Sequence, residues 1–441
     1  MSVRKHIFAG AIGMSLLGLA GAASAQALGR PATSGPGDFG TFDDYGAFYD
    51  YSRGRNTSVL ERERPEYSAL GWRTAGFTLF PKVETGLGAT SNVYAVDTGR
   101  TSDTYLAFDP SISARSEWSR HSVRANAGLL TRKFYDETSE NETGWYVRGN
   151  GQLDMVGESY LRASSSITKD YESRFSAGSP ANAANPPKFK SFDTDLRAVY
   201  QAGRVRAAAS TTYTRIDFHD VRATTGGHID QDFRDQDIWG AQLRGEYGLT
   251  PDAAVFGRLE YSESNYRMAS ATSRDSKEWR ATTGADFDIG ALVRGEIGVG
   301  YLKREYDAAL YPSISGFSAR TQVEYFPTQL TTVTGRYERA VQDSVIANSG
   351  GYFADTVSAR VDHELLRNLL LNASVTYFKS AYQGIDRTDK VSTISAGAQY
   401  LMNRSVGIGA NLSYGDRNST GAQATSDYKV TRFVVSLVLQ R

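Results

Sequence analysis

The stretch Gly316–Glu338, GFSARTQVEYFPTQLTTVTGRYE, contains one complete unit of the pattern that this chain repeats. Between Phe317 and Tyr325, apolar or small residues alternate with polar ones such as Arg320. The alternation stops at FPTQL and then resumes as far as Glu338. A period of two predicts β-strands, because successive side chains of a strand point to opposite faces. The stretch therefore predicts a β-hairpin.

The two faces of this hairpin differ in a way that suggests a membrane. Arg320, Glu324 and Arg336 fall on one face, and a packed protein core could not bury such a row of charges cheaply. The other face is apolar and ends in Tyr325 and Tyr337, where an interfacial belt of aromatic residues would lie. We therefore expect a strand pair with lipid on one side and water on the other.

Breaks in the alternation come in two lengths that follow one another strictly. Eight short breaks, beginning with Trp118–His121, alternate with nine long ones, beginning with Asn92–Ser102. Short periplasmic turns and long outer loops are typical of outer-membrane barrels. The sequence therefore predicts an all-β fold, a transmembrane antiparallel up-and-down β-barrel of about 18 strands formed by residues 76–441 of a single chain.

Composition narrows the classes of protein further. The 441 residues carry no formal net charge, which argues against a nucleic-acid-binding protein. Cysteine is absent from the sequence, which excludes disulfides and thiolate metal sites. After residue 25, no apolar run is long enough for a membrane helix.

The first 25 residues have the features of a secretory signal peptide. Arg4 and Lys5 precede the apolar run Ile7–Leu19, and Ala23-Ser24-Ala25 offers a cleavage site before Gln26. The alternative, a short membrane anchor, is weaker because the run is too short to span a bilayer. In a Gram-negative cell, export followed by barrel formation predicts the outer membrane. Residues 26–75 are expected to form a periplasmic N-terminal segment, either flexible or acting as a plug or docking segment.

Charged residues recur at positions expected to face the lumen. Pairs such as Arg244/Glu246 and Arg258/Glu260 place both signs on one face, two residues apart. One interpretation is a wall held rigid by ion pairs, and the other is a polar track for a hydrated solute. Mixed signs predict weak ion selectivity. The expected lumen and translocation path comprises Arg115, Arg124, Arg148, Arg197, Arg206, Arg244, Glu246, Arg258, Glu260, Arg280, Asp286, Arg294, Glu296, Arg320, Glu324, Arg336, Glu338, Arg360 and Asp362.

Tyrosines recur near the strand ends of the apolar face. If the strands stand side by side, these residues form two rings at the membrane interfaces, although aromatic residues also favour strands in general. The expected aromatic girdle comprises Tyr200, Tyr213, Tyr247, Tyr261, Tyr301, Tyr325, Tyr337, Tyr377, Tyr400 and Tyr414.

Nothing in the sequence favours an enzyme. Five histidines are present, and His219-Asp220 and His228-Ile229-Asp230 share one long loop. These could form a metal or protease-like site, but loop histidines and aspartates are more commonly solvated. No nucleophile elbow, zinc-binding helix motif or phosphate loop occurs. We therefore expect no catalytic site, no metal and no cofactor.

Several short motifs stand out along the chain: Arg62–Arg73 (RERPEYSALGWR), Gly76–Pro81, Ser91–Ala95, Trp118–His121, Asp286–Asp288, Leu292–Glu296, Pro327–Thr334 and Val361–Leu369. Together they resemble the putative β-barrel porin 2 family. The similarity covers nearly all of the chain after the signal peptide, although Trp72 and Ala89-Thr90 depart from the family pattern. The resemblance implies an outer-membrane protein associated with secretion of exopolysaccharide or adhesive holdfast material.

The function expected from these observations is export of a surface polysaccharide across the outer membrane. The expected partners are outer-membrane lipid, the polysaccharide itself and a periplasmic or outer-membrane polysaccharide export protein, with no nucleic acid. Two alternatives remain open: a general diffusion porin for small solutes, and a closed barrel with a structural or adhesive role.

Overall fold

The computed structural model describes residues 56–268 and 273–441, and strands dominate them. The first half of the described chain contains β1 (Trp72–Thr74), β2 (Phe77–Thr90), β3 (Asp103–Ser116), β4 (Ser122–Phe134), β5 (Glu142–Asp154), β6 (Tyr160–Tyr171), β7 (Lys188–Ala202), β8 (Val205–Phe218), β9 (Val221–Arg222), β10 (His228–Ile229) and β11 (Gln236–Thr250). The second half contains β12 (Ala253–Tyr266), β13 (Ser276–Ile289), β14 (Val293–Tyr306), β15 (Ile314–Thr328), β16 (Thr331–Asp343), β17 (Gly351–Leu366), β18 (Leu369–Tyr382), β19 (Thr388–Leu401), β20 (Val406–Thr420) and β21 (Tyr428–Gln440). Two short 3₁₀ turns, η2 (Thr138–Glu140) and η3 (Asp232–Arg234), lie in loops. Within these described ranges, no helix has the length and apolar composition needed to cross a membrane.

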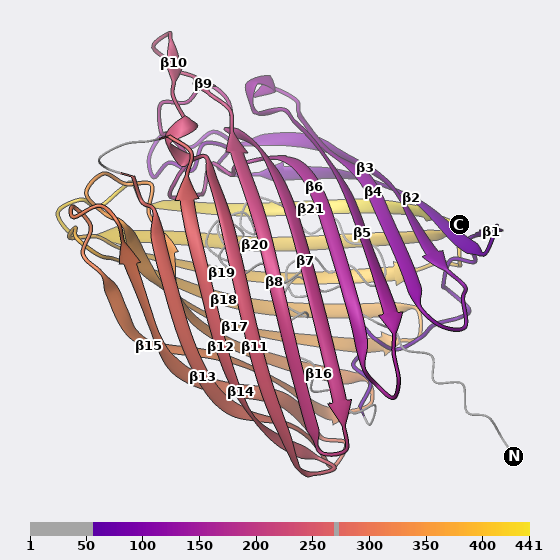
Figure 1. The fold of residues 1–441 in the computed structure, drawn as a ribbon. Coiled ribbons are helices and arrows are strands. Elements are labelled where there is room, and N and C mark those ends of the chain that lie inside the picture. The colour runs from indigo at the N-terminus through magenta and orange to yellow at the C-terminus, as the bar shows by residue number, and fades with distance from the viewer. Residues whose placement is uncertain (1–55, 269–272) are drawn as a thin grey trace, which may run out of the picture.

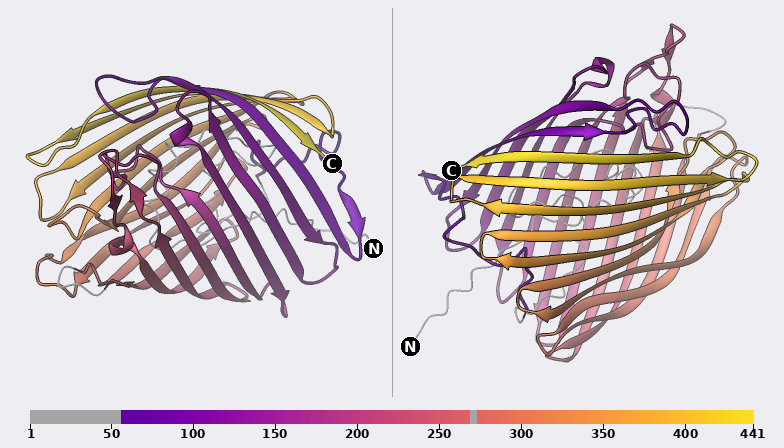
Figure 2. Two further views of the ribbon diagram at one scale, coloured as in Figure 1. Left: turned by 90° about the horizontal axis from the view of Figure 1, so that it is seen from above. Right: turned by 180° about the vertical axis from the view of Figure 1, so that it is seen from behind.

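The long strands close into a barrel. Each pairs antiparallel with the next one along the chain, and β8 pairs directly with β11. The last strand, β21, pairs with β2 from Lys82↔Gln440 to Thr90↔Arg432, which joins the two ends of the sheet. The closed wall therefore has 18 strands (β2–β8 and β11–β21), as the alternation of short and long breaks predicts (Figures 1 and 2).

The two ends of the barrel differ in the length of their connections. At one end the connections are tight turns, such as the one between β15 and β16 within the motif that opens the sequence analysis. At the other end longer loops connect the strands, and the β9–β10 hairpin projects beyond the wall from one of them (Figure 1). The chain enters β2 and leaves β21 at the turn end, since antiparallel strands of an even number return to their starting side.

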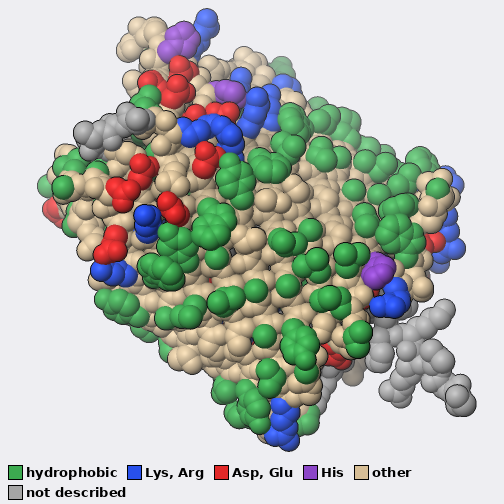
Figure 3. All heavy atoms as spheres, in the orientation of Figure 1, with side chains coloured by type: hydrophobic (Ala, Val, Ile, Leu, Met, Phe, Trp, Pro, Cys, Tyr) green, Lys and Arg blue, Asp and Glu red, His purple; other side chains and the backbone are tan. Residues whose placement is uncertain are grey.

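The outer surface of the wall is apolar over its middle. Leu243, Leu259, Ile297 and Ile394 are each about half exposed on this surface, where strand alternation places them away from the lumen. Figure 3 shows green hydrophobic side chains spread over the wall, with charged side chains gathered toward the loops and turns. Side chains that would be costly to expose to water are thus presented outward all round a closed sheet, which is the arrangement of a transmembrane barrel.

A short segment precedes the barrel. Residues 56–71 lead into β1, which pairs with the start of β2 from Trp72↔Leu79 to Thr74↔Phe77. The expected segment 26–75 therefore contains a three-residue strand at its end. The expected signal peptide, residues 1–25, and residues 26–55 of the expected N-terminal segment lie outside the described residues.

Candidate functional site

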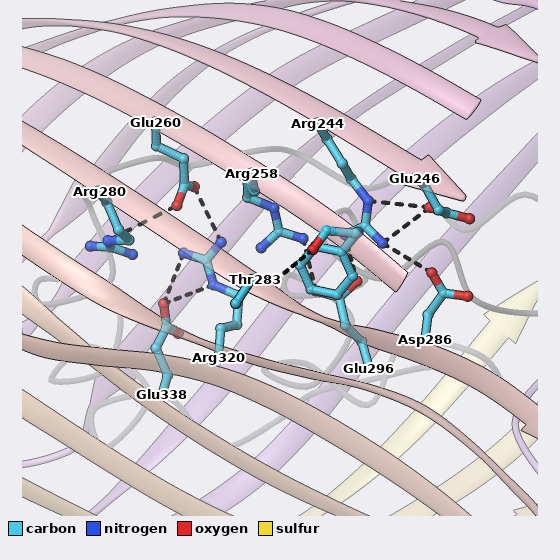
Figure 4. A network of polar contacts seen from close by, with 11 residues as sticks. Arg244, Glu246, Arg258, Glu260, Arg280, Thr283, Asp286, Glu296, Arg320 and Glu338 are labelled. Carbon is cyan, nitrogen blue, oxygen red and sulfur yellow. Dashed lines mark hydrogen bonds and ion pairs between the residues drawn. The ribbon is translucent and has the colours of Figure 1, made fainter. Parts of the chain in front are cut away.

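The inner face of the wall carries a network of ion pairs from β11 to β16 (Figure 4). Arg244 on β11 contacts Glu246 on its own strand at 3.2 Å, Asp286 on β13 at 3.2 Å and Glu296 on β14 at 2.7 Å. Arg258 on β12 contacts the second carboxylate oxygen of Glu296 at 2.8 Å. One glutamate thus binds two guanidinium groups, and its own side chain is fully buried.

The network continues around the wall through Glu260. Its carboxylate lies 3.4 Å from Arg320 on β15 and 4.0 Å from Arg280 on β13. Arg320 also contacts Glu338 on β16 at 3.2 Å, and Arg280 contacts Glu278 at 2.9 Å. Charges of opposite sign therefore alternate across six neighbouring strands, and the buried charges are compensated within the wall.

Gly284 on β13 leaves space on the inner face for these contacts. At Gly284, a Cβ atom would lie 2.1 Å from the carbonyl oxygen of Ile297 and 2.7 Å from the Phe256 ring. The Phe256 ring therefore lies over Gly284, and the guanidinium of Arg244 stacks on that ring with its Cζ 3.9 Å from the ring centre. Because no side chain occupies this inner position on β13, Arg244 can reach across to β14.

At the turn end of the lumen, Arg294 joins the wall to the segment that precedes the barrel. It pairs with Glu324 on β15 at 2.6 Å and with Glu61 of the segment at 2.8 Å, and it donates a hydrogen bond to the backbone oxygen of Asn56. The Asn56 side chain in turn donates a hydrogen bond to Asp288. Residues 56–61 are thus held against the inner wall by charge-assisted contacts with the buried side chains of Arg294 and Asp288.

A second set of contacts holds the rest of this segment. Arg64 pairs with Glu364 on β17 at 2.6 Å, and both side chains are buried. The backbone amide of Val59 donates to the hydroxyl of Thr332 on β16. Residues 56–64 therefore cross from β13 to β17 along the inner face, near the turns.

Predicted lumen cations on the first strands of the barrel stand apart from this network. Arg115 on β3 and Arg124 on β4 lie directly opposite each other, so two like charges face the lumen side by side. Arg115 also lies over the Phe80 ring. Arg244 and Arg258 lie opposite each other in the same way on the β11–β16 side, where Glu296 pairs with both of them.

The structure thus sorts the predicted lumen residues into groups. The network of β11–β16 contains Arg244, Glu246, Arg258, Glu260, Arg280, Asp286, Glu296, Arg320 and Glu338. Arg294 and Glu324 join the N-terminal segment, and Arg360 and Asp362 pair with each other on β17 at 2.7 Å. Arg336 lies on the inner face of β16, while Arg115, Arg124, Arg148, Arg197 and Arg206 lie on β3–β8.

The tyrosines of the predicted girdle all fall on the outward parity of their strands. Most are substantially exposed: Tyr200, Tyr247, Tyr301, Tyr325, Tyr377, Tyr400 and Tyr414. The other three lie toward the loops and donate hydrogen bonds to carboxylates, namely Tyr213 to Asp237, Tyr261 to Glu263 and Tyr337 to Asp355. A phenol with an apolar ring and a polar hydroxyl suits the boundary between lipid and water.

A second set of tyrosines lies inside the barrel, and the sequence analysis did not single it out. They share the inward parity of their strands and the strand ends nearest the long loops: Tyr105, Tyr266, Tyr306, Tyr352, Tyr382 and Tyr428. Arginines stack on several of these rings, with the Arg417 Cζ 4.6 Å from the Tyr428 ring and the Arg387 Cζ 5.0 Å from the Tyr382 ring. Parity alone could have separated these tyrosines from the outer girdle.

Loops from opposite sides of the barrel meet above these inner tyrosines. Phe175, in the loop between β6 and β7, packs edge-on against Tyr428 at the start of β21, with 4.9 Å between ring centres. Gly178 of the same loop lies beside Val345, which belongs to the β16–β17 loop. Arg274, before β13, donates hydrogen bonds to the backbone oxygens of Ile346 and Ser349. These contacts narrow the loop end of the lumen.

A buried carboxylate lies at this loop end. Asp235 accepts a hydrogen bond from the backbone amide of Phe218, and Arg267 bridges it to Asp217. Burial raises the pKa of Asp235 to about 6, and the neighbouring Asp217 carboxylate adds to this rise. Asp235 thus titrates near neutral pH at the loop mouth.

Three further carboxylates gather in the same long loop. Ligand atoms of Asp220, Asp230 and Asp232 lie within 4.8 Å of one another, and all three residues are exposed. The group includes neither His219 nor His228. Exposed acidic groups of this kind are common without a metal, so the cluster supports no metal site.

A hollow of about 420 Å³ lies on the outer side of the wall. Leu243, Gly245, Gly257, Leu259 and Val299 are among the residues that line it. The two glycines leave the space open between larger apolar side chains. Because these residues point outward, the hollow faces lipid and does not belong to the path through the lumen.

Comparison with known sequences identifies one family. A family described as putative beta-barrel porin 2 matches residues 64–441, which is nearly the whole described chain. A search of curated proteins finds no match.

Solved structures of outer-membrane barrels resemble the chain at low identity. The siderophore receptor PirA from Acinetobacter baumannii is 7% identical, with a TM-score of 0.45, over 82% of this chain and 80% of that one. The outer membrane protein OpdK from Pseudomonas aeruginosa is 13% identical, with a TM-score of 0.44, over 82% of this chain and 99% of that one. OccAB3 from A. baumannii is 10% identical, with a TM-score of 0.44, over 83% of this chain and 100% of that one.

Proposed function

Because this chain belongs to the putative beta-barrel porin 2 family, we propose that it forms an outer-membrane channel through which a surface polysaccharide leaves the cell. The family and the closed 18-stranded wall support a channel in the outer membrane. We further propose that the transported solute is a polysaccharide and that it moves outward.

The side chains that line the inner wall support a polysaccharide as the solute. Ion-paired arginines and carboxylates on β11–β17, together with tyrosines such as Tyr352 and Tyr382, line the lumen. Guanidinium and phenol groups donate hydrogen bonds and carboxylates accept them, which matches the hydroxyl groups along a sugar chain. Since most charges already have a partner of opposite sign, the wall favours hydrated, mostly neutral polymers over small ions.

The two ends of the lumen favour a selective channel over a general diffusion porin. Loops from opposite sides meet at one end, where Phe175 packs on Tyr428. At the other end, the segment 56–64 lies on the inner wall, held by ion pairs that include Arg64–Glu364. Both features reduce the free cross-section, so passage would require movement of the loops or of the segment. We propose that the segment acts as a plug on the periplasmic side.

We propose that a partner protein binds near this segment. A periplasmic or outer-membrane polysaccharide export protein would contact the turn end of the barrel, where Glu66 and Arg367 form an exposed ion pair. Binding there could displace the segment from the wall and open the channel. The barrel itself needs no catalytic group for this role.

A deletion strain tests the function directly. Loss of secreted polysaccharide, with normal uptake of small nutrients, is the expected result, and expression of the wild-type chain should restore secretion. A strain that keeps its secreted polysaccharide and loses small-solute uptake would contradict export and favour a diffusion porin. A strain that loses neither would favour a structural barrel.

Planar-bilayer recordings add a control that does not depend on secretion. We expect low conductance from the intact chain and higher conductance after Glu364→Gln, which removes the anion that holds Arg64. The matched variant Glu117→Gln, whose partner Arg73 is exposed at the same end of the barrel, should conduct like the wild type. A large steady conductance of the wild-type chain would contradict a plugged channel.

A further inference from the structure

Arg432 is a buried cation, and among the described residues no carboxylate lies within ion-pair distance of it. It lies on the inner face of β21, and only 8% of its surface is exposed. Its guanidinium stacks on the Phe175 ring, whose centre lies 4.2 Å from the guanidinium carbon. A buried charge is costly unless it is paired, so this site would gain from an anion that comes from elsewhere.

Arg387 provides an internal comparison. It is also 8% exposed, and it also stacks on an aromatic ring, that of Tyr382. Its guanidinium, however, forms an ion pair with Asp389 at 2.6 Å and donates a second hydrogen bond to the same carboxylate. Arg387 therefore has both an aromatic ring and a carboxylate as partners, whereas among the described residues Arg432 has only the ring.

Two buried phenols near Arg432 are also unsatisfied. The hydroxyl groups of Tyr105 and Tyr428 are inaccessible to solvent and have no hydrogen-bond partner among the described residues. Tyr428 and Arg432 both contact the Phe175 ring, and Tyr105 lies on β3, the second strand from Arg432. Unsatisfied buried donors are rare in folded proteins, so two such hydroxyls in the surroundings of an unpaired guanidinium suggest an acceptor that the described residues do not supply.

The strand geometry explains how Tyr105 reaches this place. Arg432 on β21 lies opposite Thr90 on β2, and Tyr105 on β3 lies opposite Gly88. A Cβ atom at Gly88 would lie 2.2 Å from Cζ of Tyr105, so the tyrosine ring crosses directly over the glycine toward β21. Gly88 is thus the residue that lets a β3 side chain approach Arg432.

The charged residues around Arg432 favour an anionic ligand. Arg132 and Arg417 lie beside the two tyrosines, with Arg132 over the Tyr105 ring and Arg417 over the Tyr428 ring. Among the described residues, Arg132 pairs with the carboxylate of Glu142 at 3.3 Å, and Arg417 is bound by the backbone oxygen of Ser426. Of the three guanidinium groups only Arg132 has a carboxylate at ion-pair distance, so the cluster has an excess of positive charge.

We propose that Arg432, Tyr105 and Tyr428 form a binding site for an oxyanion at the loop end of the lumen, and that the group bound is the carboxylate of an acidic sugar unit in the passing polymer. The guanidinium and the two phenol hydroxyls donate hydrogen bonds to the carboxylate oxygens. Phe175 covers the site from the β6–β7 loop. The identity of the guest as a transported polymer rests on the proposed function, whereas the existence of the oxyanion site does not.

Ligand-dependent thermal unfolding of the full chain in detergent micelles tests this site. The unfolding temperature would be followed by the gel-mobility shift of the heated barrel, with D-galacturonate, D-galactose or inorganic phosphate added at constant ionic strength in chloride. We expect galacturonate to raise the temperature in a saturable way and galactose at equal concentration to have no effect. Arg432→Gln should weaken the galacturonate affinity about tenfold or more.

Arg387→Gln is the matched control, since it removes an equally buried, ring-stacked guanidinium that has its own carboxylate. It should leave the response to galacturonate unchanged. An equal loss in both variants, or no response of the wild type to galacturonate, would overturn the proposal. A response to phosphate alone would overturn the assignment of a sugar carboxylate.

The phenols provide a second variant if Arg432→Gln does not fold. Tyr105→Phe removes one donor and leaves the ring over Gly88, so it should weaken galacturonate binding while preserving the barrel. Undiminished affinity in Tyr105→Phe would count against the site. Because binding in micelles does not depend on secretion, a deletion strain that still secretes polysaccharide would refute the proposed function and leave this measurement intact.

Discussion

Arg244 on β11 and Glu296 on β14 form a 2.7 Å ion pair although two complete strands, β12 and β13, lie between them. Neighbouring strands are spaced about 4.8 Å apart, so a flat sheet would separate the two backbones by roughly 14 Å. The two side chains span this gap because Gly284 places no side chain between them and because the Arg244 guanidinium rests on the Phe256 ring. A single ion pair thus links β11 to β14 across the two strands between them.

Glu296 is expected to be the most sensitive position of this network. Glu296→Gln removes the shared anion: Arg244 keeps Glu246 and Asp286, but Arg258, buried directly opposite Arg244, loses the carboxylate that it pairs with. We expect the free energy of unfolding to fall by about 3–5 kcal/mol. Urea unfolding of the barrel in micelles, followed by tryptophan fluorescence, measures this change.

An exposed ion pair provides the control for Glu296. Lys303 and Glu305 pair at 2.6 Å with both side chains more than half exposed. Glu305→Gln should leave the free energy of unfolding nearly unchanged, because solvent screens an exposed pair. If Glu296→Gln were as mild as Glu305→Gln, the network would contribute nothing to stability.

Gly284 is expected to tolerate no side chain. In Gly284→Ala the added Cβ would lie 2.1 Å from a backbone oxygen of β14, so strands must move apart. We expect a loss of at least about 1–3 kcal/mol and a smaller folded fraction, measured as the share of unheated protein with the mobility of a compact barrel.

Gly257, on the neighbouring strand, distinguishes this clash from a general preference for glycine. A Cβ atom at Gly257 would meet no atom within 4 Å, because the position opens onto the outer hollow. Gly257→Ala should therefore fold like the wild type. Similar losses in the two variants would show that the clash at Gly284 is not the cause.

The contact between Arg64 and Glu364 is expected to control access to the N-terminal segment. Glu364→Gln removes the carboxylate that pairs with Arg64. It also removes the longer ion pairs of Glu364 with Arg62 and Arg367. Residues 56–64 should then leave the inner wall more often, which exposes the bond after Arg62 to trypsin. We expect cleavage there to be several-fold faster, as followed by mass spectrometry of the released peptides.

Glu117→Gln again serves as the reference, because Glu117 pairs with the largely exposed Arg73 at the same end. Its cleavage rate after Arg62 should equal that of the wild type. Equal acceleration in both variants would mean that loss of any carboxylate at the turn end loosens the segment.

Asp235 is expected to make the loop mouth sensitive to pH. Burial raises its pKa to about 6, so between about pH 4 and pH 6 the folded chain binds a proton that the unfolded chain has released. This contribution therefore stabilises the folded state at low pH and is lost as the pH rises through 6. The difference in free energy of unfolding between pH 5 and pH 7.5 should be smaller in Asp235→Asn than in the wild type.

Asp97, an exposed loop aspartate paired with Arg100, controls for the removal of a carboxylate as such. Asp97→Asn should keep the pH dependence of the wild type. A wild-type dependence that persists unchanged in Asp235→Asn would assign it to other groups.

The strand pattern of the sequence was sufficient to predict the architecture of the barrel. Alternation with a period of two assigns each residue to a face through local backbone geometry alone, and the lengths of the breaks order the strands. Arg244, Arg258 and Arg294 accordingly lie on the inner face, and 18 strands close the wall. The inner tyrosines, Tyr352 and Tyr382 among them, obey the same parity, so the sequence contained their position as well.

What the sequence could not determine is which inner residues meet. Period and parity describe a strand and its immediate neighbours, whereas the pair Arg244–Glu296 depends on the curvature of four strands, and the contact of Arg64 with Glu364 joins residues 300 positions apart. The isolation of Arg432 likewise depends on Phe175 crossing from a distant loop to β21. Such contacts arise only when the sheet closes and its loops fold over the lumen, because closure is a property of the whole wall and local alternation is the same in an open sheet.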